Sequence, residues 1–197
     1  MLKHQNHYMF SMDMKTLFGN NNNERNNINA IGGSGYAICS GSFDTTVRIW
    51  DIETTKQLNV FKGHENWILS VKYGLNELRN TILSGSDESV RLWDIRSGQQ
   101  IQVFKGHIYG VTCVEYSPFV IKNSTDVIGG SSNVICSGSI DNTIRFWDIR
   151  SNKNGLCVIK GDDEKDEGVM CFKMKRKAKA MITLVVVLIY VTVHAVV

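Results

Sequence analysis

The chain has 197 residues, of which 43% are hydrophobic, so it can bury the core of one domain of ordinary size. Its formal net charge is only +3, and most of the excess lies in one short stretch without interleaved aromatic residues, which argues against a nucleic-acid-binding surface. The five cysteines form no Cys-x-x-Cys pair, which argues against zinc binding and favours reduced thiols in a reducing compartment.

The same sequence phrase occurs three times and ends each time in Trp-Asp. The tryptophans of the three copies are Trp50, Trp93 and Trp147, which lie 43 and 54 residues apart. Apolar and polar residues alternate before them, as in residues 47–50 and 143–147, and this alternation predicts strands with two unlike faces. A period in the forties that ends in Trp-Asp is typical of four-stranded units arranged around an axis.

Two Gly-His pairs, Gly63-His64 and Gly106-His107, precede the second and third copies. With Ser-Gly-Ser and a turn aspartate, the pattern resembles the WD-repeat (WD40) family over about residues 36–161. The resemblance implies an all-β partial β-propeller of about three four-stranded blades plus the start of a fourth. Closed propellers use about four to eight blades, so the chain is part of a longer ancestor, completes the ring with a second copy, or is marginal alone.

In this family a serine, the Gly-His histidine, a turn aspartate and the tryptophan form a buried hydrogen-bonded set. The resemblance implies the sets His64, Ser84, Asp87, Trp93 and His107, Ser137, Asp141, Trp147, and in the first repeat Ser40, Asp44, Trp50 with His4 as the candidate histidine. A catalytic His-Asp dyad is the alternative. Chemistry needs one site, whereas a structural device recurs in every copy, so we expect structural sets, no enzyme, no cofactor and no metal.

Two departures from the repeat pattern affect the expected register. Ser84 and Trp93 are nine residues apart, against ten for the corresponding pairs in the other two repeats, so one turn residue is missing. Because side chains alternate with a period of two, this loss threatens the register unless the turn absorbs it. Gly161 is followed by Asp162 where a third Gly-His is due, so a fourth blade begins there without reaching Trp-Asp.

These patterns divide the chain. We place the WD-repeat segment at residues 1–174, with repeats at about residues 4–51, 62–103 and 105–150, a mobile Asn-rich loop at 19–35 and a partial fourth blade at 161–174. An inserted polar loop at residues 120–132 explains the longer spacing of the third repeat.

The C-terminal residues 180–197 contain no charged side chain and follow a basic juxtamembrane cluster at 175–179. As a helix this run would span about 27 Å, which matches a thin bilayer. It predicts a transmembrane tail anchor, with the propeller at the cytoplasmic face. An accidental gene end with an aggregation-prone tail and a buried strand are the alternatives.

The function expected from these features is that of a non-enzymatic scaffold that binds a protein or peptide. The resemblance implies a working face at the Gly-His loops and aspartate turns, and the candidate anchors there are Trp67, Tyr109, Phe43 and Ile140. Packing of Trp67 against a neighbouring blade is the alternative for that residue. The alternatives for the whole chain are a degenerate fragment without a stable platform and a substrate-recognition subunit of a larger complex.

Overall fold

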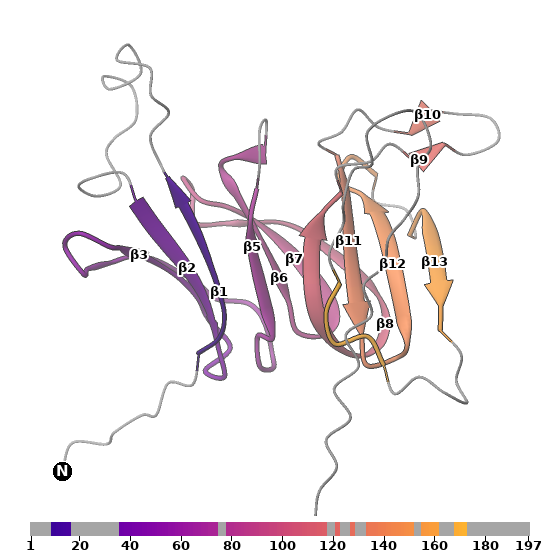
Figure 1. Ribbon diagram of the computed structural model, residues 1–197. Helices are drawn as coiled ribbons and strands as arrows, with labels where there is room; N and C mark the ends of the chain where they lie inside the picture. Colours follow the sequence, from indigo (N-terminus) through magenta and orange to yellow (C-terminus); the bar gives the residue numbers. More distant parts are fainter. Residues whose placement is uncertain are drawn as a thin grey trace, which may run out of the picture.

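The computed structural model shows an all-β protein whose antiparallel blades stand side by side (Figure 1). The structure describes residues 9–16, 36–74, 78–117, 121–122, 127–128, 133–151, 155–161 and 168–172. Its first blade is a sheet with the strand order β1 (Met9–Thr16), β2 (Tyr36–Ser42), β3 (Val47–Asp51) and β4 (Gln57–Phe61). This blade confirms the four-stranded unit predicted from the repeats.

The second and third blades form one continuous sheet because they share a long strand. In chain order its strands are β5 (Ser70–Tyr73), β6 (Thr81–Gly85), β7 (Asp87–Asp94), β8 (Gln100–Tyr116), β11 (Val134–Ser139), β12 (Thr143–Asp148) and β13 (Cys157–Lys160). The first part of β8 pairs with β7, and residues 111–116 pair with β11. Strand β8 is therefore the last strand of the second blade and the first strand of the third.

The core lies between neighbouring blades. Alternation along β3 directs Val47 and Ile49 of the first blade into a buried cluster with Ile82 and Trp93 of the second. A second cluster joins the second and third blades in the same way, and a third covers the far face of the third blade. Each blade thus buries its apolar side chains against the next one, as the period-two pattern requires.

One aromatic contact repeats at each boundary between blades. Phe61, at the end of the first blade, packs on Trp93 with ring centroids 5.7 Å apart, and Phe104 packs on Trp147 at 5.8 Å. Trp93 and Trp147 are both fully buried, whereas Trp50 of the first blade is only half-buried. The described residues include no preceding blade that could supply Trp50 with the equivalent phenylalanine.

Backbone hydrogen bonds join the blades at the end toward which the arrowheads of β11 and β13 point (Figure 1). Ile68 N donates to Ser42 O at 3.2 Å, Val111 N to Ser86 O at 2.9 Å, and Val169 N to Ser139 O at 2.9 Å. The third bond places residues 168–172 where a fourth blade begins, and Phe172 is buried against the third blade. The fold is accordingly a partial propeller.

We call this end of the blades the turn face, defined by residues 42–46, 63–69, 85–89, 106–111 and 139–143. The insertion in the third repeat lies at the opposite end, where it contains a two-stranded hairpin of β9 (Ile121–Lys122) and β10 (Val127–Ile128) (Figure 1). This position separates the insertion from the predicted working face.

Some predictions fall on residues that the structure does not describe. These are His4, the Asn-rich loop at 19–35, Asp162, the basic cluster at 175–179 and the apolar run at 180–197. Within the described ranges, no helix has the length and apolar character needed to cross a bilayer.

Candidate functional site

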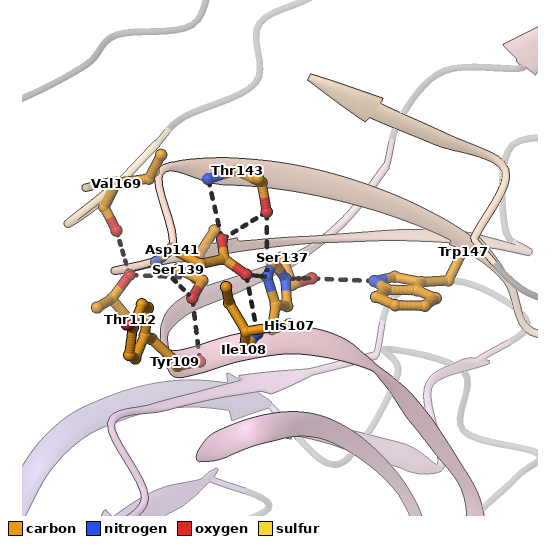
Figure 2. A network of polar contacts seen from close by, with 11 residues as sticks. His107, Ile108, Tyr109, Thr112, Ser137, Ser139, Asp141, Thr143, Trp147 and Val169 are labelled. Atoms are coloured by element: carbon orange, nitrogen blue, oxygen red, sulfur yellow. Dashed lines mark hydrogen bonds and ion pairs between the residues drawn. The ribbon is translucent and has the colours of Figure 1, made fainter. Parts of the chain in front are cut away.

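The third repeat contains the complete hydrogen-bonded set, shown in Figure 2. His107 Nδ1 lies 2.8 Å from Asp141 Oδ2, and His107 Nε2 lies 2.8 Å from Ser137 Oγ. The indole N–H of Trp147 donates to the same Ser137 Oγ at 2.9 Å, and the Thr143 hydroxyl donates to Asp141 Oδ1 at 2.5 Å. The side chains come from β8, from β11, from the turn after β11 and from β12, so the set fixes the Gly-His segment to the blade.

The electrostatics of this set favour a neutral imidazole beside an ionised carboxylate. Burial lowers the pKa of His107, against the opposite effect of Asp141. Burial also acts to raise the pKa of Asp141, but hydrogen bonds from Thr143, His107 and the Ile108 N–H outweigh it, and its pKa lies below the ordinary value. His107 therefore donates from Nδ1 to Asp141 and accepts from the Ser137 hydroxyl at Nε2.

The second repeat has the same histidine, serine and tryptophan but a different aspartate. His64 Nε2 lies 2.6 Å from Ser84 Oγ, and Trp93 Nε1 donates to that oxygen at 2.8 Å. Burial, helped by the Arg91 charge, lowers the pKa of His64 to about 3. The fourth member differs from the expectation, because no hydrogen bond joins Asp87 to His64 among the residues that the structure describes.

The cause is the residue missing from the turn of the second repeat. In the third repeat, Asn142 N donates to Ser139 O across the turn, and Asp141 lies over the histidine. In the second repeat, Ser86 N donates to Ser89 O, which closes a two-residue hairpin turn with Glu88 at φ 55°. The shorter turn keeps the strand register, but it leaves the Asp87 side chain exposed.

The first repeat satisfies its aspartate with an arginine. Trp50 Nε1 donates to Ser40 Oγ at 2.9 Å, as in the other repeats. The backbone N–H and hydroxyl of Thr46 donate to Asp44 Oδ1 at 3.0 and 2.6 Å, and the Arg48 guanidinium donates to Oδ2. The arginine thus binds the carboxylate oxygen that corresponds to the one bound by His107 in the third repeat.

The anchor residues predicted from the sequence all lie on the turn face. Trp67, Tyr109 and Ile140 are exposed by 53%, 59% and 47%. Phe43 is half-buried beneath Trp67, with ring centroids 4.3 Å apart, so Trp67 packs on the first blade and still presents much of its surface to solvent. Sequence reasoning missed Ile108, which is 65% exposed and follows the buried His107 directly.

Two of these anchors, Tyr109 and Ile140, adjoin one another at the seam between the second and third blades. Ile140 N donates to Gly110 O at 3.0 Å, and the Ser139 hydroxyl donates to Tyr109 O at 3.0 Å. A Cβ on Gly110 would lie 3.3 Å from Leu69 Cδ1 and 3.4 Å from Ile140 Cδ1. Gly110 therefore lies in close contact with both side chains.

Comparison with known proteins identifies the repeats. The family model described as "WD domain, G-beta repeat" matches residues 14–51, 55–94 and 98–148, which is more than half of the chain. The chain belongs to the WD-repeat family. The matched segments include the Trp-Asp ends of all three blades, and they agree with the resemblance in the sequence.

Several curated relatives match about 60% of this chain, which spans a quarter or less of their own length. Nuclear distribution protein PAC1 of Coccidioides posadasii is 35% identical over 122 residues, which is 62% of this chain and 25% of that protein. CCR4-associated factor 4 homolog of Candida glabrata is 28% identical over 60% of this chain and 20% of its own length. E3 ubiquitin-protein ligase COP1 of Arabidopsis thaliana is 29% identical over 63% of this chain and 17% of its own length.

Proposed function

We propose that this WD-repeat chain is a non-catalytic scaffold that binds a protein or peptide at its turn face. The observation that carries the proposal is the group of exposed apolar side chains on that face: Trp67, Ile108, Tyr109 and Ile140. Large exposed apolar and aromatic residues supply most of the binding energy at protein interfaces, often about 2 kcal/mol or more each. The buried sets beneath hold the loops in place, so little ordering is needed on binding.

The His-Asp pair supports a structural role in this proposal. The side chains of His107 and Asp141 are each only 1% exposed, and both already make hydrogen bonds within the set. A general base must reach a proton of the substrate. A pair enclosed in this way offers no such approach, and it serves to fix the loop.

A capture experiment tests the proposal. The full chain is immobilised, and proteins retained from cell extract are compared between the wild type and a double variant with Trp67→Ala and Tyr109→Ala. The matched control is Ile101→Ala, because Ile101 is 52% exposed on β8, outside the turn face. We expect the double variant to lose the retained proteins and the control to keep them. Equal retention by all three would contradict the proposal.

We also propose that residues 180–197 anchor this scaffold to a membrane, with the blades on the cytoplasmic side. The support is the sequence itself, since eighteen residues without a charged side chain follow a basic cluster. The chain should stay with membranes through carbonate extraction. Replacing Val186 and Leu188 by arginine should release it, because a charge at the centre of a spanning helix is unfavourable by about 2.5–3.5 kcal/mol. Extraction of the wild-type chain by carbonate would contradict the anchor.

Completion of the ring by a second copy also stays a proposal. The half-buried Trp50 supports it, because its counterparts in the other blades are fully buried by a preceding blade. The mass of the full chain in detergent solution tests it. A dimer is expected, and a monomer at all concentrations would contradict it.

A further inference from the structure

The three turn aspartates of the blades are satisfied in different ways. Asp141 is enclosed by His107 and Thr143, and Asp44 is bound by Thr46 and Arg48. Asp87 is exposed, and among the described residues its carboxylate accepts a side-chain hydrogen bond only from the amide of Asn66. The shortened turn of the second repeat has thus moved one carboxylate out of the structural set and onto the turn face.

This carboxylate lies among the apolar anchors. A Cβ on Gly110 would lie 3.4 Å from Asp87 Oδ1 and 3.4 Å from Ile140 Cδ1, so the acid adjoins the seam next to Tyr109. Asn66 donates to the other carboxylate oxygen and accepts from the backbone N–H of Trp67 at 2.8 Å. A single short network therefore holds the acid and Trp67 in a fixed relation.

Asp87 has two further exposed acids and one exposed lysine near it in the chain and in the strand register. Glu65 and Glu88 are also exposed on the loop and turn that carry Asn66 and Asp87. Within the part of the chain that the structure describes, none of these three acids is in a salt bridge. The nearest lysine in the strand register is Lys105, which pairs with Ser89 on β8 and is likewise exposed.

We propose that Asp87 receives a lysine or arginine side chain of the protein or peptide that binds the turn face. The carboxylate would bind the cationic group, while Trp67 and Tyr109 would pack against its aliphatic stem. A cation near aromatic rings and a carboxylate gains from both, and the gain is larger where the partner excludes water. Charge complementarity of this kind sets specificity more than affinity. The inference rests on the proposed function, because it assigns the chemistry of the partner.

Peptide display tests this assignment directly. The full chain is immobilised and exposed to a library of random twelve-residue peptides, and the selected peptides are sequenced. We expect lysine and arginine to be enriched at one position of the peptides that bind the wild type. In the variant Asp87→Lys that enrichment should disappear and be replaced by aspartate and glutamate. The control Glu53→Lys reverses the charge of an exposed acid beyond the far end of β3 and should keep the wild-type preference.

The affinity of one selected peptide gives a second measurement. We expect Asp87→Asn to weaken binding about three- to tenfold, as for a partly exposed charge pair. Added salt should weaken binding to the wild type more than binding to Asp87→Asn. Weaker binding of the wild type at higher salt is measured on the unaltered chain, so it tests the charge contribution even if the Asp87→Asn substitution disturbs the turn.

The outcomes separate the two proposals. Peptides without a cationic preference, or a preference that persists in Asp87→Lys, would overturn the assignment. If binding then still depends on Trp67 and Tyr109, the proposed scaffold function stands without it. If no peptide binds in a way that depends on Trp67 and Tyr109, both fail.

Discussion

At the scale of single residues, the buried histidines determine how the blades respond to acid. His64 and His107 are both buried, and each bonds a serine that also accepts a tryptophan N–H. A protonated imidazole could no longer accept from the serine hydroxyl, and its charge would be poorly solvated. Protonation of either histidine should therefore destabilise the folded state.

The first prediction concerns the pH dependence of stability. The pKa of His64 is about 3 in the folded protein, below the ordinary value of 6.5, so the unfolded chain binds an extra proton between these values. The contribution of His64 to the free energy of unfolding should be unaffected by protonation well above pH 6.5. It should fall as the pH drops, by about 1–2 kcal/mol at pH 5. Urea denaturation of the wild type and His64→Gln at pH 7.5 and pH 5 checks this. The variant should lose less stability on acidification, and an unchanged loss would contradict the assignment.

At the scale of the structural element, the turn between β6 and β7 separates the second blade from the other two. One residue fewer between Ser84 and Trp93 is absorbed entirely within the turn, and the pairing of Ser84 with Arg91 is retained. The shorter turn removes the His-Asp hydrogen bond that the third repeat has. The first and third blades carry Phe43 and Ile140 at the corresponding extra position.

The second prediction restores this residue. Insertion of an isoleucine between Ser86 and Asp87 should rebuild the longer turn and bring Asp87 over His64. A new hydrogen bond of this type is worth about 0.5–1.5 kcal/mol. We expect the free energy of unfolding to rise by that amount in urea denaturation, with the pKa of His64 raised in NMR titration. A destabilised variant with an unchanged His64 pKa would contradict the explanation of the turn.

The sequence was sufficient for the repeated parts of this design. The spacing of Trp, Gly-His and turn aspartate predicted the blades. The resemblance to the WD-repeat family implied the set around His107 and a working face that carries Trp67 and Tyr109. The sequence also showed that a turn residue was missing in the second repeat. It did not predict where Asp87 would lie, because a shortened hairpin can either shift the strand register or change the turn, and only packing decides between them. Ile108 was missed because its neighbour His107 is buried, and exposure in an irregular loop follows no period.

At the scale of the whole molecule, the blades form a stack whose members protect one another. The second and third blades receive a phenylalanine and a histidine from the blade before, with ring contacts to Trp93 and Trp147. Trp50 and Ile38 of the first blade are half-buried, although their counterparts Trp93 and Ile82 are almost fully buried. In a repeat architecture, stability then depends on how many boundaries a blade shares.

The third prediction compares two tryptophans at equivalent positions. Truncation of a buried tryptophan to alanine costs about 3–5 kcal/mol. We expect this cost for Trp93→Ala and clearly less for Trp50→Ala, because less apolar surface is removed from the core at Trp50. The free energies of unfolding from urea denaturation give the comparison. An equal decrease in the free energy of unfolding for both variants would mean that Trp50 is buried to the same degree as Trp93, which would contradict the structure.

The central claim is that partners bind the turn face of a propeller held by buried sets, and hydrogen–deuterium exchange of the full chain with a selected peptide tests it most directly. The account predicts slower exchange on binding in residues 63–69 and 106–111, with no change in the loop between β3 and β4 at the opposite end. Protection confined to that opposite end would contradict the claim.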